Sequence, residues 1–418
     1  MAATPQAVDT LLHAHWVIPV EPDLTCLEHT SLALRAGRIV DILPTAAART
    51  RYTATETVEL PNHALIPGLI NAHTHAAMSL FRGLSDDLPL MDWLTKHIWP
   101  AEAKWISAEF VRDGVRLAAA EMLKSGTTCV NDMYFFPEAS AAVLREAGMR
   151  ACIGLILIDF PTAYAQTPDE YFEKGLMLHD SLRHDPLLRT AFAPHAPYSV
   201  SDASLAKIRT VNNELNLPVH MHVHETAHEV NEAVAKTGKR PLARLDALDL
   251  LGPTLAAVHM TQLNPEEIAR LAEAGASVVH CPESNLKLAS GYCPVHALLN
   301  AGVNVALGTD GAASNNDLDM LGELRTAALL AKAVSGDATA VPARTALAMA
   351  TLNGARALGM EEETGSLKPG KAADITAIDL SGLASQPVYD PISQIVYTAV
   401  RDQVTDVWVA GRRLLATR

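Results

Sequence analysis

The sequence predicts an α/β protein whose main part is a (β/α)8 TIM barrel, flanked by a small β-sandwich domain built from both termini. From residue 64 onward, eight short apolar segments alternate with longer segments of helical periodicity, as βα units do around a parallel sheet. These repeats occupy roughly 250 residues, the usual length of such a barrel. The two ends of the chain instead alternate short strands with glycine turns.

The expected strands and helices follow one another regularly along the chain. The eight strands are ALIPGLINAH (64–73), TTCVND (127–132), RACIGLILI (150–158), RTAFAPH (189–195), PVHMHVH (218–224), LAAVHM (255–260), ASVVHC (276–281) and NVALGTD (304–310). Among the helices, residues 108–126 end in a glycine stop signal, and residues 264–275 begin with an Asn cap followed by Pro. We expect one long helix over residues 342–360 to close the barrel before the chain returns to the small domain.

The shift in composition divides the chain into three parts. We assign residues 1–63 and 365–418 to the two parts of the β-sandwich and residues 64–364 to the barrel. Hydrophobic residues at 49% and charged residues at 19% describe an ordinary globular protein. A homo-oligomer is compatible with this composition.

Charge and cysteine content exclude several classes of partner and location. The formal net charge of −14 argues against a nucleic-acid polymer as partner, because a phosphate backbone requires a basic surface. No apolar run approaches the length of a membrane span, and the first residues lack the pattern of a signal peptide. Five scattered cysteines without a CxxC pair fit a reducing cytoplasm. We therefore expect a cytoplasmic protein that acts on a small molecule.

The stretch LPVHMHVHETAHEV (217–230) allows two conflicting interpretations. The five residues from His224 to His228 match HExxH, the zinc signature that metalloproteases carry on a helix. Three histidines at alternate positions, His220, His222 and His224, instead fit one face of a β-strand. A helix and a strand imply different folds and different chemistry.

Local signals favour the strand. Pro218 opens the segment and valines occupy alternate positions, as in a strand. Thr226 and Glu229 then form an S/T-x-x-E capping box, which predicts a helix that begins at Thr226. His224 would precede this helix and could not share it with His228. We therefore interpret the HExxH match as a coincidence.

Six of the eight expected strands carry at their ends a His or Asp that we consider as a site residue, at the face where barrel enzymes have their active sites. His73 and His75 project to the same side of the first strand, close enough to bind one cation, and Asp310 ends the last strand. His222 or a neighbour would point into the same site, with Glu225 just beyond it. The other strand ends carry His195, His259 and His280. Imidazoles with a carboxylate suit zinc or another divalent first-row metal, although the histidines of the fifth strand alone could simply fill the barrel.

Several segments together resemble the amidohydrolase superfamily, and within it the 5-methylthioadenosine/S-adenosylhomocysteine deaminases and the related s-triazine hydrolases. These segments are PGLINAHTHAAMSLFRGL, HMHVHET, AVHMTQL, HCPESNLKLASG, LGTDGAASNNDLDM and LKPGKAADITAIDL, and the resemblance covers nearly the whole chain. It implies the metal ligands His73, His75, His222 and Asp310. No lysine occurs in RTAFAPHAPYS, where binuclear members place a bridging lysine, so one Zn²⁺ is implied.

The resemblance also suggests roles for the remaining site residues. Hydroxide made available by zinc would attack the amine-bearing carbon of a heteroaromatic ring while Asp310 accepts the proton of the water. Glu225 would protonate the ring nitrogen and then the leaving amine, as a non-ligand carboxyl does in zinc deaminases. His259 would orient the attacking hydroxide. His280 would support its strand end rather than bind the metal.

Two further residues are implied in substrate binding. His195 matches a substrate-contacting histidine of the family, and Glu102 matches the glutamate that binds the ribose hydroxyls. Trp93 and Trp99 could form an apolar wall, although packing in the core is an equal alternative. The segment IDFPTAYAQTPDEYF offers no arginine for the carboxylate of S-adenosylhomocysteine. 5'-Methylthioadenosine or another uncharged adenosine derivative, such as adenosine, is therefore favoured over S-adenosylhomocysteine.

The expected function is zinc-dependent hydrolytic deamination of an adenosine-type purine nucleoside, giving the inosine-type product and ammonia. One alternative is a deaminase or chlorohydrolase for another amino-heterocycle, of the s-triazine or guanine type. Another is a catalytically inactive binding protein on the same fold, against which the intact ligand positions and Glu225 argue.

Overall fold

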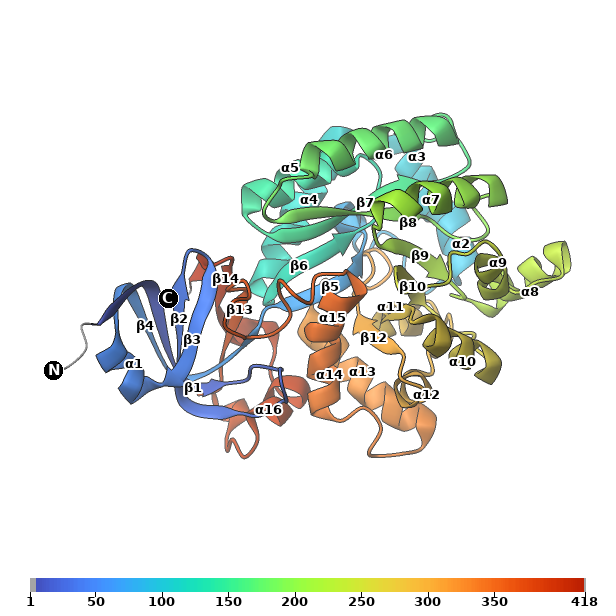
Figure 1. Cartoon of the computed structure of the whole chain (residues 1–418). Helices are drawn as coiled ribbons and strands as arrows, with labels where there is room; N and C mark the ends of the chain where they lie inside the picture. Colours follow the sequence, from blue (N-terminus) through green and yellow to red (C-terminus); the bar gives the residue numbers. More distant parts are fainter. Residues whose placement is uncertain (1–4, 417–418) are drawn as a thin grey trace.

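The computed structural model describes residues 5–416 and contains two sheets, one for the barrel and one for the small domain (Figure 1). The barrel strands, hydrogen-bonded in the order β12-β11-β10-β9-β8-β7-β6-β5, are β5 (Leu69–Thr74), β6 (Thr127–Asp132), β7 (Arg150–Leu157), β8 (Leu188–Pro194), β9 (Val219–Val223), β10 (Leu255–His259), β11 (Ser277–His280) and β12 (Asn304–Leu307). All neighbouring pairs in this order are parallel. Each of the eight predicted strands is present, which confirms the fold class.

The first and last strands of the barrel meet just beyond their ends. The Asp310 N–H donates to the His73 carbonyl oxygen at 3.0 Å. The Thr309 N–H donates to Asn71 Oδ1 at 3.1 Å. The line between β5 and β12, which we call the seam, therefore brings together residues from opposite ends of the barrel sequence.

Helices follow the strands and cover the outside of the barrel. They are α4 (Ala108–Lys124), α5 (Pro137–Ala147), α6 (Pro168–Leu182), α7 (Asp202–Leu215), α8 (Ala227–Thr237), α9 (Pro241–Ala247), α10 (Pro265–Ala274), α11 (Pro282–Lys287), α12 (Val295–Asn300) and α13 (Met320–Ser335). One of them, α10, shows why the sequence signals succeed. The Asn264 side chain and Glu267 form a reciprocal capping box at the start of α10, and Gly275 ends that helix in the left-handed conformation.

A short composite helix follows β5 and η1 (Ala76–Phe81). It consists of α2 (Leu90–Trp93), the π-helical turn η2 (Leu94–Ile98) and α3 (Trp99–Trp105). Such π turns are rare and occur frequently at functional sites. We call residues 90–105 the lid helix.

The prediction of one long helix over residues 342–360 is wrong, because the segment forms α14 (Ala343–Met349) and α15 (Leu352–Ala357). The Ile70 N–H donates to the Ala350 carbonyl at 2.8 Å, so this carbonyl bonds to the barrel instead of continuing the helix. A Cβ on Gly354 would come within 2.9 Å of Ile70 Cγ2. The second helix thus packs directly against the start of β5 at the N-terminal end of the barrel.

Both ends of the chain build the small domain, as predicted. Its seven strands, in the order β15-β14-β13-β4-β1-β2-β3, are β1 (Gln6–Val17), β2 (Leu27–Arg35), β3 (Arg38–Pro44), β4 (Tyr52–Pro67), β13 (Ile375–Asp379), β14 (Val404–Val409) and β15 (Arg412–Ala416). The remaining elements of the two ends are α1 (Thr45–Arg51), η3 (Leu383–Ser385), α16 (Pro391–Tyr397) and η4 (Arg401–Gln403). The division at residues 63 and 364 stays a prediction, and β4 continues in this sheet as far as Pro67. Across residues 5–416, no helix has the length and apolar character of a membrane span.

A buried ion pair joins the barrel to the small domain. Arg150, at the start of β7, contacts Asp374 through Nε–Oδ2 at 2.6 Å and Nη2–Oδ1 at 3.2 Å. Neither side chain is more than 3% exposed. Arg150→Met would leave the Asp374 charge buried without its cation, so we expect a loss of about 3–5 kcal/mol in the free energy of unfolding.

Urea unfolding followed by circular dichroism, with zinc at saturation, measures this loss. The control is Arg49→Met, because Arg49 forms an exposed ion pair with Glu59 at 2.7 Å, and exposed pairs contribute less than about 1 kcal/mol. Equal midpoints for the two variants would contradict the assigned importance of the buried pair.

Candidate active site

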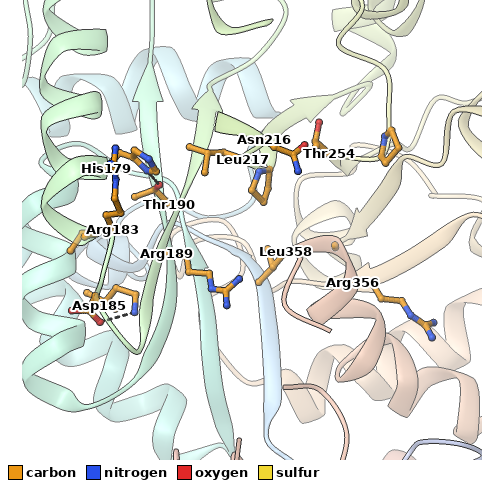
Figure 2. A pocket seen from close by; sticks show the side chains of 16 residues that line it. His179, Arg183, Asp185, Arg189, Thr190, Asn216, Leu217, Thr254, Arg356 and Leu358 are labelled. Carbon is orange, nitrogen blue, oxygen red and sulfur yellow. Dashed lines mark hydrogen bonds between the residues drawn. The ribbon is translucent and has the colours of Figure 1, made fainter. Parts of the chain in front are cut away.

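Two large cavities lie at opposite ends of the barrel. The one near the N-terminal ends of β8 and β9 has a volume of about 470 Å³, and Arg183, Arg189 and Arg356 lie on its wall (Figure 2). Helices α6, α7 and α15 end beside it, and cations offset the partial negative charge of helix C-termini. Arg183 and Arg356 lie at such helix ends, and barrel enzymes carry out chemistry at the other end of the barrel.

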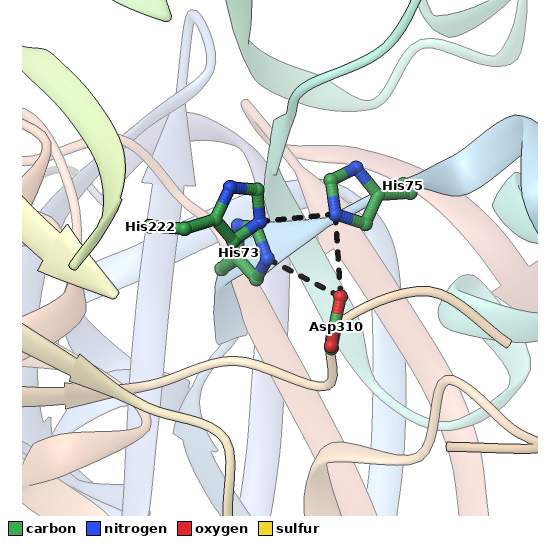
Figure 3. A group of neighbouring side chains, drawn as sticks. All are labelled: His73, His75, His222 and Asp310. Atoms are coloured by element: carbon green, nitrogen blue, oxygen red, sulfur yellow. Dashed lines mark hydrogen bonds and ion pairs between the residues drawn. The ribbon is translucent and has the colours of Figure 1, made fainter. Parts of the chain in front are cut away.

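Four side chains converge at the C-terminal end of the barrel (Figure 3). His73 lies near the end of β5 and His75 just after it, His222 lies on β9, and Asp310 follows β12. One ligand atom from each lies within 4.8 Å of all the others. His75 Nε2 is 3.2 Å from His222 Nε2, and Asp310 Oδ1 is 3.3 Å from Nε2 of both His73 and His75.

These separations suit a metal ion. In a tetrahedral zinc site with bonds of about 2.0–2.1 Å, neighbouring ligand atoms lie roughly 3.3 Å apart. Three imidazole nitrogens and one carboxylate oxygen are also the ligand types that zinc prefers. The four residues therefore fit a single divalent cation by both distance and chemistry.

Hydrogen bonds orient all three imidazoles with Nε2 toward this centre. The His75 Nδ1–H donates to the Met133 carbonyl at 2.5 Å, and the His222 Nδ1–H donates to the His195 carbonyl at 2.7 Å. His73 Nδ1 lies 2.7 Å from His220 Nε2. Apart from its 3.3 Å contact with Asp310 Oδ1, the buried His73 Nε2 has no hydrogen-bond partner, as expected of an atom that faces a metal site. Such outer contacts fix the tautomer of metal-binding histidines.

The protonation states also suit a cation. Burial lowers the pKa of His73 to about 4 and that of His222 well below its ordinary value. Burial alone would raise the pKa of Asp310, but the hydrogen bond and charge of His73 hold it well below the usual range. Neutral imidazoles and an ionised carboxylate are the forms in which these residues bind metals.

Glu225 and His259 lie beside this centre. The two residues approach through His259 Nε2 and Glu225 Oε2 at 3.8 Å. Burial, followed by the charge of Asp310, raises the pKa of Glu225 to about 8, which favours the protonated form of its carboxyl. His259 Nδ1 contacts Asn285 Oδ1 at 2.9 Å, which leaves Nε2 facing the site.

The cavity above these residues has a volume of about 520 Å³. Seven of the predicted site residues line it: His75, Glu102, His195, His222, Glu225, His259 and Asp310. Its apolar wall comes largely from the lid helix and the ends of β6 and β7: Trp93, Leu94, Ile98, Trp99, Met133, Phe135, Ile156 and Ile158. His73 lies beneath the cavity floor, and His280 is buried outside the lining. The predicted polar residues thus line a single cavity, whose remaining wall is largely apolar.

Sequence reasoning missed three supporting contacts. The Ser284 hydroxyl donates to Asp310 Oδ2 at 2.6 Å, and Asn285 orients His259. The Tyr134 hydroxyl donates to Glu102 Oε1 at 2.6 Å. Ser284 and Asn285 stand within the segment HCPESNLKLASG that carried the family resemblance, and this was the available signal. Tyr134 had no comparable signal.

The histidine-rich stretch resolves as a strand followed by a helix. Strand β9 ends at Val223, and α8 begins at Ala227 with Thr226 as its cap. His224 is buried, and its Nε2 accepts a hydrogen bond from the Leu242 N–H at 3.1 Å. His228 lies on the exposed side of α8. No helix carries both residues, so the HExxH interpretation is excluded.

Comparison with known proteins agrees with this geometry. A model of the amidohydrolase family matches residues 64–414. The chain belongs to the amidohydrolase family. It is 54% identical over 411 residues to a 5-methylthioadenosine/S-adenosylhomocysteine deaminase of Teredinibacter turnerae, which covers 98% of this chain and 93% of the relative. A protein of the same name from Saccharophagus degradans is 52% identical over 410 residues, covering 98% of this chain and 92% of the relative.

Solved structures show the same architecture for this amidohydrolase. The crystal structure of an adenosine deaminase from Xanthomonas campestris with bound zinc superposes with a TM-score of 0.98 at 57% identity, covering 99% of this chain and 94% of the other. An atrazine chlorohydrolase from Arthrobacter aurescens superposes with a TM-score of 0.91 at 24% identity, covering 98% and 95%. The second comparison supports the fold alone. The family prediction made from the sequence is confirmed.

Proposed function

We propose that this amidohydrolase is a zinc-dependent deaminase of adenosine-type nucleosides, with 5'-methylthioadenosine as the favoured substrate. The observation that carries the proposal is the position of the buried Glu225 carboxyl beside the His73, His75, His222 and Asp310 cluster, in one cavity with Glu102. Relatives at up to 54% identity named as deaminases of methylthioadenosine and S-adenosylhomocysteine support it. All five cysteines are free, which supports a cytoplasmic location.

The four clustered residues would hold one zinc ion. When bound, zinc makes hydroxide available near neutral pH. Asp310 Oδ1 faces the imidazoles, whereas Oδ2 accepts the Ser284 hydroxyl. Oδ2 is therefore the oxygen that can take the proton of the attacking water.

Proton transfer to the substrate falls to Glu225. Water adds to C6 of the purine while the Glu225 carboxyl donates its proton to the neighbouring ring nitrogen. The Glu225 carboxylate then takes the proton of the new C6 hydroxyl and passes it to the amine, the C6–N bond breaks as the C6 carbonyl forms, and ammonia leaves. The proton held by Asp310 restores the Glu225 carboxyl. Since His259 Nδ1 is committed to Asn285, its Nε2 lone pair is free to orient the water. Asp310, Glu225 and His259, which supply these proton transfers and contacts, all line the same cavity.

The ribose would be bound at the lid helix. Tyr134 occupies one side of Glu102 Oε1, and the remaining lone pairs of the carboxylate can accept both vicinal hydroxyls. His195 lines the cavity close to the metal ligands, and its ring centroid lies 5.0 Å from that of His222. Burial lowers the pKa of His195 to about 3, so it contacts the substrate as a neutral imidazole.

The cavity favours an uncharged 5' substituent. Among its lining residues within 5–416, the charged or acidic ones are Glu102, Glu225 and Asp310, and there is no lysine or arginine. The carboxylate of S-adenosylhomocysteine would lose its hydration without gaining a charge-assisted hydrogen bond, which is worth about 1.5–3 kcal/mol. We expect kcat/KM for methylthioadenosine to exceed that for S-adenosylhomocysteine by roughly 10-fold or more.

Ammonia release by the zinc-loaded protein tests both statements. The panel contains methylthioadenosine, S-adenosylhomocysteine, adenosine, free adenine, guanine and an s-triazine, with a chelated sample restored by zinc as the metal control. Turnover confined to guanine or the triazine would reject the nucleoside proposal. Preference for S-adenosylhomocysteine would reject only the specificity.

A further inference from the structure

The loop between β9 and α8 has an unusual backbone conformation at His224, the residue before Glu225. His224 has a φ of +54°, in the left-handed region that residues other than glycine rarely adopt. Glu225 is only 6% exposed. Its carboxyl approaches His259 Nε2 at 3.8 Å, which is too long for a hydrogen bond. The direction of the Glu225 carboxyl therefore depends on how the loop backbone is held.

Glu229, in the first turn of α8, binds this backbone from one side. Its carboxylate accepts the Glu225 N–H at 2.7 Å and the His224 N–H at 3.2 Å. Glu229 is 8% exposed, and the Thr226 hydroxyl oxygen accepts the Glu229 N–H at 3.2 Å. The expected capping box is thus half formed, because the glutamate reaches past the helix cap to the two residues before it.

Thr261, just after β10, binds the same backbone from the other side. Its N–H donates to the His224 carbonyl at 3.0 Å. Its hydroxyl donates to the Glu225 carbonyl at 2.7 Å. The N–H and carbonyl groups of both loop residues are consequently held by one carboxylate and one threonine, which are 32 residues apart in the chain.

We propose that Glu229 is a positioning residue, which fixes the peptide groups of His224 and Glu225 so that the Glu225 carboxyl points at the ring nitrogen of the substrate. This inference rests on the proposed function, because that function gives Glu225 its role in proton transfer. Glu229 does not reach the substrate and acts through the loop. We expect substitution of Glu229 to lower kcat rather than to raise KM, because misplacing a reacting group by about 1 Å can cost on the order of 100-fold in rate.

Glu229→Gln tests the proposal with little change in shape. The amide oxygen can still accept one N–H, but the amide nitrogen then faces the other N–H. We expect kcat for methylthioadenosine to fall roughly 10- to 100-fold, with KM and zinc content unchanged. The matched control is Glu232→Gln on the same helix, whose side chain is 47% exposed; it should keep the full kcat. Thr261→Val removes the opposing hydroxyl and should lower kcat in the same way, which covers a failure of Glu229→Gln to fold.

A double-variant cycle separates positioning from a general loss of structure. In a Glu225→Gln background the carboxyl to be positioned is gone, so Glu229→Gln should cause no further loss of kcat. A loss of equal size in both backgrounds, or an unchanged kcat in Glu229→Gln and Thr261→Val, would overturn the positioning role. Full activity of Glu225→Gln alone would instead overturn the mechanism under the proposed function, so the two failures are distinguishable.

Discussion

Glu225→Gln should lower kcat for methylthioadenosine by about 1000-fold, within the 10²–10⁴ range of general acid–base catalysis. The amide has nearly the same shape but can neither donate a proton to the ring nitrogen nor carry one to the leaving amine. Because Glu225 is not among the four clustered ligand residues, bound zinc should remain at the level of the unchanged protein. Steady-state ammonia release and metal analysis of the same samples measure both quantities.

The control for this variant is Glu266→Gln, which removes an exposed carboxylate from the first turn of α10. It should be fully active. Retained turnover in Glu225→Gln would remove Glu225 from the mechanism. Loss of zinc together with turnover would show that the residue supports the metal centre instead.

Glu102→Ala should raise KM for methylthioadenosine about 100-fold or more and leave turnover of free adenine, at whatever level it occurs, unchanged. Two charge-assisted hydrogen bonds to the ribose, each worth about 1.5 kcal/mol or more, disappear together. The variant also strands the buried Tyr134 hydroxyl that donates to Glu102. Comparison of KM for the nucleoside and for the base isolates the ribose contribution.

Glu109→Ala serves as the control, because this glutamate is exposed in the first turn of α4. It should leave both constants unchanged. Equal losses for nucleoside and base in Glu102→Ala would mean that the residue does not read the ribose. The rival functions on triazines or guanine would then regain support.

Much of the architecture is encoded locally and could be predicted. The strand segments are short apolar runs, and cap residues mark the ends of helices, such as Asn264 and Gly275 at the two ends of α10. The same kind of signal predicted the start of α8, whose N-cap is Thr226. Because parallel strands place their C-terminal ends at one face, the strand-end histidines and Asp310 were expected to lie together.

Other features depend on contacts between distant parts of the chain. The break between α14 and α15 arises where Ile70 captures the Ala350 carbonyl, and no local signal announces it. The choice of His222 among three alternating histidines required the family resemblance. His220 and His222 share one face of β9, whereas His224 follows the strand. Their height along the barrel axis separates His222, beside His75, from His220, which lies behind His73. Sequence spacing carries no information on that height.

The seam between β5 and β12 has a consequence for how the protein matures. His73 and Asp310 lie on opposite sides of it, so Asp310 reaches the three histidines with which it would bind the metal only after the last strand has docked on the first. In a chain still under synthesis the histidines are present before Asp310 is in place. We therefore expect tight metal binding only after the barrel has closed. Once captured, the ion favours the closed form by mass action. A metal ion bound there would thus stabilise the completely folded barrel, in addition to its proposed part in the chemistry.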